Sequence, residues 1–271
     1  NQKNPEIGEF HVGVGYRHLL KIRYPGKDIE KVVSTPPHDV VGEGYKENLL
    51  KPDDLDLVNN LNRVILESRE LLSDHPVNVE RVNSGKKPAN SIWLWGQGRR
   101  PSLEPIKEKY GISAAVISAV TLVKGLGNCS GMDIIDVPGA TGYYDTSYEN
   151  KAEYGLKALE NHDLVLIHVE APDEAGHAGD IEKKIEAIEN LDKKVVGGVL
   201  DELDEDYTVV VTADHPTPID VGSHVSDPVP FAFYSPKIES NDSVSYDEVS
   251  GSEGQEGVLD GHDLMRRIIR A

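Results

Sequence analysis

Residues 164–169 read Leu164-Val165-Leu166-Ile167-His168-Val169, an apolar run interrupted by a single histidine. A long stretch follows at residues 181–203, with apolar side chains recurring at helical spacing on one face. A second apolar run, Thr-Val-Val-Val-Thr, occupies residues 208–212. Continuous apolar strands separated by amphipathic helices are typical of a mostly parallel sheet that helices cover on both faces. The sequence therefore predicts an α/β fold for this part of the chain.

The same alternation extends in both directions from this segment. It predicts strands at 114–118, 133–137 and 230–234, and helices at 119–126 and 151–161. Near residue 91 the sequence changes from a polar, mixed pattern to alternating predicted strands and helices. We therefore divide the chain into parts 1–90 and 91–271, and the second part begins with the apolar run at 92–95. In the first part, residues 10–22 predict one or two strands. Residues 52–72 predict a helix with Pro52 in its first turn. The acidic segment 239–256 is predicted to be a solvated loop.

The charge of the chain limits what it can bind. Among 271 residues, 28 are Lys or Arg and 47 are Asp or Glu, which gives a formal net charge of −19. This balance argues against a nucleic-acid partner and against attachment to anionic membranes. Cys129 is the only cysteine, so an intrachain disulfide is impossible, and no run is apolar enough for a membrane helix. These features indicate a cytoplasmic protein. Because the sequence does not begin with Met, we expect a processed product or a fragment.

Acidic and histidine residues follow the predicted strands. Asp173 and His177 come after the strand that ends at 169, and Asp214 and His215 come directly after the strand that ends at 212. His224 lies just before the next strand. Ligands of open α/β sheets gather at the carboxyl ends of strands, and Asp with neutral His suits Zn²⁺ or Mn²⁺. We therefore predict a metal site, with a dinuclear centre that could clamp a phosphoryl oxygen.

Each of these residues also has a plain structural interpretation. Asp173 could cap a helix, His177 could be an ordinary surface histidine, and Asp214 could merely end a strand. Taken singly, each residue favours the structural role. Five such residues at consecutive strand ends favour the metal site. The remaining histidines that we considered are interpreted as surface or core residues: His11, His75, His162, His168 and His262.

Several motifs resemble a known family along nearly the whole chain. They are Asp173-Glu-Ala-Gly-His177, Thr212-Ala-Asp-His-Pro-Thr-Pro218, Gly222-Ser-His-Val-Ser-Asp-Pro-Val-Pro-Phe231, Gly15-Tyr-Arg-His-Leu-Leu20, Pro36-Pro-His-Asp39, Leu94-Trp-Gly-Gln-Gly98 and Pro138-Gly-Ala-Thr-Gly142. Together they resemble the archaeal-type cofactor-independent phosphoglycerate mutases of the alkaline phosphatase superfamily.

That resemblance implies a fold and an activity. Residues 91–271 would form an alkaline-phosphatase-like metal-binding core, and residues 1–90 would form part of an inserted substrate-binding α/β domain. The activity would interconvert 3-phosphoglycerate and 2-phosphoglycerate in glycolysis, through a phosphoserine and two Mn²⁺ or Zn²⁺ ions. By the same resemblance, Asp173, His177 and His224 would hold one ion, and Asp214 and His215 the other.

The sequence departs from the family pattern in one respect. Family members begin with a strand that ends in a metal-ligating Asp, followed by the nucleophilic Ser, and neither occurs in this sequence. We therefore expect the carboxyl-terminal two-thirds of such an enzyme, inactive alone and with no catalytic residue of its own. Ser118, Ser147 and Ser226 are assigned ordinary polar roles. A sheet without its first strand would expose an edge, so a homo-oligomer is a further expectation.

Binding a small phosphorylated acid in so acidic a protein needs a local group of cationic side chains. Arg17 with His18, and Arg99 with Arg100, lie beside glycine-containing loops in motifs that resemble the family, and Lys124 is a third candidate. A solvated turn is the alternative for the second pair. Two other functions stay open: a related phosphotransferase such as a proposed homoserine kinase, or a non-catalytic metal-binding protein.

Overall fold

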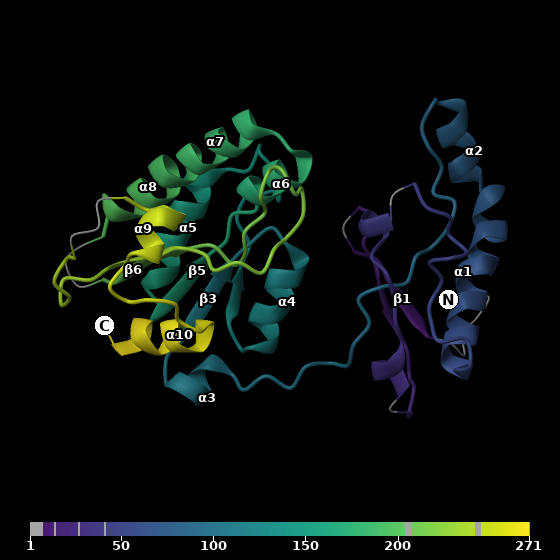
Figure 1. Cartoon of the computed structure of the whole chain (residues 1–271), viewed down its shortest axis with the longest axis horizontal. Helices are drawn as coiled ribbons and strands as arrows, with labels where there is room; N and C mark the ends of the chain where they lie inside the picture. Colours follow the sequence, from purple (N-terminus) through teal and green to yellow (C-terminus); the bar gives the residue numbers. More distant parts are fainter. Residues whose placement is uncertain are drawn as a thin grey trace. The chain divides into compact units, whose positions relative to one another are not determined.

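The computed structural model describes residues 8–13, 15–26, 28–40, 42–203, 207–241 and 245–270. The chain forms two compact units, Asn1–Pro101 and Ser102–Ala271, and each is described by itself (Figure 1). None of the helices within these ranges is long and apolar enough to cross a membrane.

The first unit is a small α/β structure. Its elements are β1 (Glu9–His11), β2 (Leu19–Lys21), the 3₁₀ helices η1 (Asp28–Lys31) and η2 (Pro37–Val40), α1 (Asp56–Ser73) and α2 (Pro76–Asn83). The two strands pair antiparallel, with Phe10 opposite Leu20. This confirms the strands predicted at 10–22.

Helix α1 supplies the core of the first unit. Val58, Leu61 and Ile65 are buried on one face at helical spacing. The helix ends at Ser73, as predicted, but it begins at Asp56 rather than at Pro52. The difference arises because residues 52–55 form a turn, in which the amide of Leu55 donates to the carbonyl of Pro52 at 3.4 Å.

The segment after α2 belongs to the first unit. Ile92 and Leu94 pack against its core, and the indole of Trp93 donates to the carbonyl of Thr35 at 2.8 Å. The apolar run at 92–95 is therefore not a strand of the second unit. The structure divides the chain after Pro101, whereas the sequence predicted a division after residue 90. The roles assigned to the two parts stay predictions.

The second unit alternates strands and helices. Its elements are α3 (Ile106–Tyr110), β3 (Ala114–Ile117), α4 (Thr121–Cys129), β4 (Asp133–Ile135), α5 (Tyr148–Leu159), β5 (Leu164–Ile167), α6 (Ala171–Ala178), α7 (Ile181–Asn190), the π-helical turn η3 (Leu191–Val196), α8 (Gly197–Leu200), β6 (Val209–Thr212), β7 (Phe231–Tyr234), α9 (Glu248–Ser252) and α10 (Gly261–Arg270). The predicted strands and helices of this part are all found, with ends shifted by a few residues.

A parallel sheet forms the centre of this unit. Its strand order is β4-β3-β5, and all four residues of β3 are buried. Strands β6 and β7 form a separate antiparallel pair. The predicted parallel sheet is thus confirmed for β3, β4 and β5, whereas β6 and β7, which were predicted to continue it, pair with each other in a sheet of their own.

Helices cover both faces of the parallel sheet. A Cβ atom at Gly127 of α4 would lie 2.5 Å from Val116, and one at Gly155 of α5 would lie 2.5 Å from Ile167 and 3.8 Å from Ile117. Because Val116 and Ile117 are consecutive residues of β3, they point to opposite faces. Helices α4 and α5 therefore pack on opposite faces, as predicted.

The acidic segment 239–256 is only partly a loop. Residues 248–252 form α9, because the side chain of Asp247 caps it by accepting from the amide of Ser250 at 2.7 Å. Residues 242–244 of this segment lie outside the described residues.

Candidate metal centre

The first predicted ligands lie on α6, which begins just after β5. Pro172 lies in its first turn, and the amide of Asp173 donates to the carbonyl of Glu170 at 2.9 Å. Asp173 and His177 are four residues apart and therefore share one face of the helix. Their side chains meet, with 3.4 Å between Asp173 Oδ2 and His177 Nε2.

The loop between β6 and β7 brings the remaining predicted ligands to the same place. Two backbone bonds fold it: the amide of Gly222 donates to the carbonyl of Pro218 at 2.8 Å, and that of Val225 to Pro216 at 3.2 Å. Gly222 has a φ of 66°, a left-handed conformation that glycine adopts without strain. The loop therefore folds back and brings the ring of His224 close to that of His215. Their ring centroids lie 3.8 Å apart.

Asp173, His177 and His224 offer one ligand atom each within 4.8 Å of one another. His224 Nε2 lies 3.3 Å from Asp173 Oδ1 and 3.0 Å from His177 Nε2. The side chain of Asp173 is 19% exposed, whereas those of His177 and His224 are 37% and 51% exposed. The cluster is therefore anchored by a largely buried carboxylate and is open to solvent on its histidine side.

The hydrogen bonding of His177 fits a metal ligand. Its Nδ1 lies 3.0 Å from the carbonyl oxygen of Gly222, which can only accept, so Nδ1 carries the proton. A neutral His177 then presents the lone pair of Nε2 to Asp173 and His224. Metal-binding histidines are oriented in this way by a carbonyl on the opposite nitrogen. A carboxylate and two imidazoles are a donor set that Zn²⁺ and Mn²⁺ accept.

Asp214 and His215 lie beside this cluster without extending it. Asp214 Oδ2 and His215 Nε2 are 3.5 Å apart, and the Asp214 side chain is 67% exposed. Within the described residues, the only group of three or more potential ligands is Asp173, His177 and His224. Binding of a second ion by Asp214 and His215 remains a prediction.

A buried polar network near the strand ends was missed by the sequence reasoning. His168 Nδ1 lies 3.1 Å from Ser118 Oγ, and His168 Nε2 lies 3.3 Å from Glu170. Lys151 of α5 is 1% exposed, and its amine donates to the carbonyl of His168 at 2.9 Å. His168, interpreted from the sequence as a surface or core residue, is thus a half-buried member of this network. The sequence signal that could have placed His168 in this network is its position at the end of a buried strand.

Burial shifts the pKa values of this network. It lowers the pKa of the Lys151 amine to about 8 and lowers the pKa of His168. Burial also raises the pKa of Glu170, and the carboxylates of Asp173, Glu174 and Asp214 raise it further. The ends of β3 and β5 thus place partly buried ionisable groups close enough to the candidate metal cluster for the Asp173 carboxylate to act on Glu170.

Thr217 is a second residue that sequence reasoning missed. It is 4% exposed, and its hydroxyl donates to Asp173 Oδ1. The quoted motif Thr212–Pro218 contains Thr217, but a threonine carries no metal-binding pattern of its own.

The predicted substrate-binding residues are divided between the two units. In the first unit, the His18 ring accepts from the amide of Gly13 at 3.2 Å, and Arg17 lies 5.3 Å from the Tyr16 ring centroid. Arg99 donates to the carbonyl of Gly26 at 2.6 Å, and Arg100 is exposed. In the second unit, Lys124 is paired with Asp136 at 2.7 Å. Their role in binding substrate stays a prediction.

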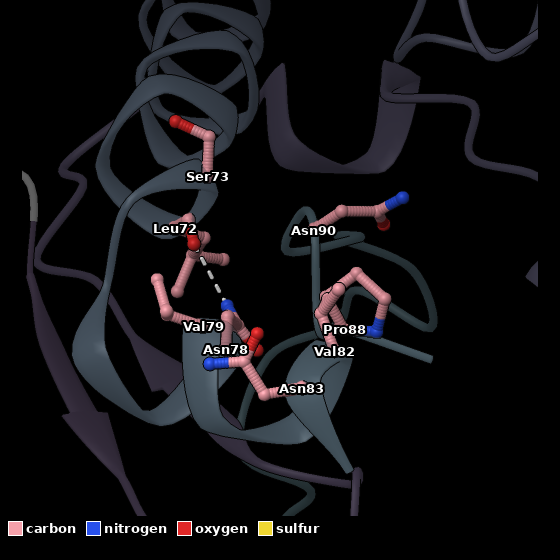
Figure 2. Close-up of a pocket in the computed structure, with 8 residues that line it drawn as sticks. All are labelled: Leu72, Ser73, Asn78, Val79, Val82, Asn83, Pro88 and Asn90. Carbon is pink, nitrogen blue, oxygen red and sulfur yellow. Dashed lines mark hydrogen bonds between the residues drawn. The ribbon is translucent and has the colours of Figure 1, made fainter. Parts of the chain in front are cut away.

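A hollow of about 390 Å³ lies in the first unit, between α1, α2 and the segment after α2 (Figure 2). It is lined by Leu72, Ser73, Asn78, Val79, Val82, Asn83, Pro88 and Asn90. The side-chain amide of Asn78 donates from Nδ2 to the carbonyl of Leu72 at 2.8 Å, the bond drawn in the figure. None of the predicted site residues lines this hollow.

The fold and the cluster together define an α/β protein with carboxylate and imidazole groups converging at the ends of its strands. The chain belongs to the Metalloenzyme superfamily, whose family model matches residues 22–265.

Within this superfamily, the chain is similar to several phosphoglycerate mutases. The chain is 48% identical over 259 residues to 2,3-bisphosphoglycerate-independent phosphoglycerate mutase 2 of Methanothermobacter thermautotrophicus, covering 95% of this chain and 63% of the relative. It is 46% identical to the 2,3-bisphosphoglycerate-independent phosphoglycerate mutase of Methanothrix thermoacetophila, covering 97% and 66%. The chain thus spans just under two thirds of the length of these relatives.

Solved structures agree with the fold. A protein from Pyrococcus horikoshii, described as PH0037, superposes with a TM-score of 0.73 at 30% identity, covering 81% of this chain and 58% of that one. The cofactor-independent phosphoglycerate mutase from Thermoplasma acidophilum superposes with a TM-score of 0.51 at 26% identity, covering 82% and 55%. The alkaline-phosphatase-like α/β fold implied by the motifs is therefore supported by solved relatives.

Proposed function

We propose that this chain is the metal-binding part of a 2,3-bisphosphoglycerate-independent phosphoglycerate mutase, which interconverts 3-phosphoglycerate and 2-phosphoglycerate. The observation that carries the proposal is the convergence of Asp173, His177 and His224 within 4.8 Å, in a chain 48% identical to a protein of that name. About a third of the length of that relative lies outside the match. The proposal therefore concerns the whole protein, and the serine that carries the phosphoryl group is proposed to lie in that remaining third.

Two ions, Mn²⁺ or Zn²⁺, are part of the proposal, and when bound they would neutralise phosphoryl oxygens and polarise the nucleophile. Asp173, His177 and His224 would hold one ion, and Asp214 and His215 would contribute to the other. The bond from His177 Nδ1 to the Gly222 carbonyl supports the first assignment, because it leaves Nε2 free. The ring of His215 lies against that of His224, with 3.8 Å between their centroids, so the second pair lies beside the first ligand set.

Recognition of a small phosphorylated acid is assigned to Arg17, His18, Arg99, Arg100 and Lys124. A guanidinium can grip a carboxylate or phosphate with two parallel hydrogen bonds. The pair Lys124–Asp136 does not oppose this role, because the Asp136 side chain is 86% exposed and such surface pairs exchange at little cost. A role in glycolysis, a cytoplasmic location and a homo-oligomeric state complete the proposal.

The direct test is an assay of the polypeptide encoded by the complete reading frame, purified with Mn²⁺. We expect ³¹P NMR to show conversion of 3-phosphoglycerate to 2-phosphoglycerate. In a separate assay with ATP as the phosphoryl donor, we expect no phosphoryl transfer to homoserine. Phosphorylation of homoserine, or no conversion in a protein shown to hold metal, would overturn the proposal in favour of the two alternatives. The 271-residue chain assayed alone is expected to be inactive. Its activity would show that the nucleophile lies within it.

A further inference from the structure

Thr217 contacts two of the candidate metal ligands, Asp173 and His215, although no pattern in the sequence indicates this. Its hydroxyl donates to Asp173 Oδ1, and the same oxygen lies 3.4 Å from His215 Nδ1. Thr217 therefore touches one residue from each of the two proposed ligand sets. The side chain is buried, so water does not compete for these bonds.

The Asp173 carboxylate determines where the proton of Thr217 lies and influences where that of His215 lies. An ionised Asp173 carboxylate can only accept, so the Thr217 hydroxyl must donate to it. The hydroxyl oxygen is then left with lone pairs only, and it can contact His215 Nδ1 favourably if that nitrogen carries the proton. The contact thus favours the tautomer of His215 with Nε2 unprotonated, the form that binds a metal, whereas Asp214 Oδ2, 3.5 Å from Nε2, favours a proton there.

Two neighbouring helices fix Thr217 itself. Lys184 of α7 donates to the Thr217 carbonyl at 2.6 Å. On α6, a Cβ at Gly176 would lie 2.4 Å from the carbonyl oxygen and 2.9 Å from the methyl group of Thr217, so the absence of a side chain at Gly176 permits this packing. The methyl group is held against α6 while the hydroxyl faces Asp173.

We infer that Thr217 is a positioning residue for the proposed metal centre: its hydroxyl orients the Asp173 carboxylate and selects the metal-binding tautomer of His215. The inference rests on the proposed metal site. A carboxylate oxygen has lone pairs for both a hydroxyl and a metal, so the bond to Thr217 does not block Asp173. It restricts the rotation of the carboxylate so that its oxygens stay directed at His177 and His224, which lie 3.4 and 3.3 Å away.

The test compares three variants of the 271-residue chain. Thr217→Val keeps the shape and removes the hydroxyl, whereas Thr217→Ser keeps the hydroxyl and removes the methyl group. Thr146→Val is the matched control, because Thr146 is also buried, at 5% exposed, and its hydroxyl accepts from the backbone amide of Thr141 rather than contacting a candidate ligand. Thermal unfolding of each variant shows whether it is folded.

Calorimetric titration with Mn²⁺ gives the first readout. We expect Thr217→Val to bind Mn²⁺ about 10- to 100-fold more weakly than the unsubstituted chain, as is usual when a group that orients a ligand is lost. Thr217→Ser and Thr146→Val are expected to bind as the unsubstituted chain does. Unchanged affinity in a folded Thr217→Val, or a loss in Thr217→Ser equal to that in Thr217→Val, would overturn the inference.

The tautomer of His215 gives a second readout that needs no metal. In metal-free protein, ¹⁵N NMR of the imidazole is expected to show His215 protonated at Nδ1, with this preference lost in Thr217→Val and kept in Thr217→Ser. An Nε2-protonated His215 in the unsubstituted chain would overturn the role given to Thr217 while leaving the metal site intact. Failure of the unsubstituted chain to bind Mn²⁺ would instead overturn the metal site, and with it the positioning role.

Discussion

The imidazole of His215 lies over that of His224, with ring centroids 3.8 Å apart and planes inclined by 33°. Both residues come from one loop between β6 and β7, and the loop turns back at Gly222 to bring them together. His224 also contacts Asp173 of α6, so a single ring joins the two groups of proposed ligands. The proposed metal centre is thus built from two chain segments that each follow a strand.

The three-residue cluster should lose metal affinity when one imidazole is removed. We expect His177→Ala to weaken Mn²⁺ binding by more than about 100-fold, beyond the effect of losing a group that only orients a ligand. The control is His262→Ala, because His262 is exposed and outside the cluster. Isothermal titration of the purified 271-residue chain measures both. Equal affinity in His177→Ala and in the control would show that the ion binds elsewhere.

A second prediction concerns His162, which is bonded to Asp133 at 2.9 Å. The Asp133 carboxylate and then the Ala158 carbonyl raise the pKa of His162 above its usual value. Because the folded-state pKa is the higher one, this pair stabilises the fold fully below about pH 6.5, and the contribution is lost as pH rises through the raised pKa.

NMR titration of the His162 ring measures this effect. We expect Asp133→Asn to lower the His162 pKa, and to reduce the free energy of unfolding more at pH 6 than at pH 8. Asp163→Asn is the comparison, with a smaller expected effect, because Asp163 is bonded to Ser113 and raises the His162 pKa only through its charge. A His162 pKa that is unaffected by Asp133→Asn would contradict the assignment.

The sequence was sufficient to predict those features of the fold and the site that depend on the spacing of residues or on their position after a strand. The apolar run at 164–169 predicted β5, and the four-residue spacing of Asp173 and His177 predicted a shared helical face, which α6 has. The approach of His224 to Asp173 was expected from the rule that ligands gather at strand ends, although the strands beside the two residues, β5 and the pair β6 and β7, belong to separate sheets. These features are local, or they depend on a general rule of topology.

Features that depend on single long-range contacts could not be predicted. Thr217 lies 44 residues from Asp173 in the sequence, and Lys151 lies 17 from His168. A hydroxyl or an amine at one position gives no periodic signal, so its partner appears only when the elements pack. The division after Pro101 was missed for the same reason, since Trp93 is tied to the first unit by Thr35, 58 residues away.

A third prediction tests the packing of α4 on the sheet with two glycines of one helix. Gly127→Ala places a Cβ 2.5 Å from Val116, a buried β-branched residue that cannot move aside, so we expect a loss of about 1–3 kcal/mol in the free energy of unfolding. Gly125→Ala meets no atom within 4 Å and should gain about 0.5–1 kcal/mol from helix propensity. Urea unfolding compares the two. The same sign for both would mean that α4 does not pack as described.

The last prediction concerns the buried amine of Lys151. Its pKa is about 8 in the folded chain, because burial disfavours the charged form, against 10.5 for an exposed lysine. Between these values the unfolded chain holds a proton that the folded chain lacks, so the free energy of unfolding rises with pH, by at most about 1.4 kcal/mol per unit. Below pH 8 the amine is charged in both states, and the cost of burying that charge is fully present.

Lys151→Met removes this titration, so we expect the difference in unfolding free energy between the unsubstituted chain and this variant to rise by about 1.5 kcal/mol from pH 8 to 9.5. Lys157→Met on the same helix is the control. The Lys157 side chain is 59% exposed and its amine is bonded to Glu153, which raises its pKa, so its titration falls above this window. Because tyrosines and other groups contribute equally to the compared proteins, the difference isolates the lysine. Parallel curves for the unsubstituted chain and Lys151→Met would show that the buried amine keeps an ordinary pKa.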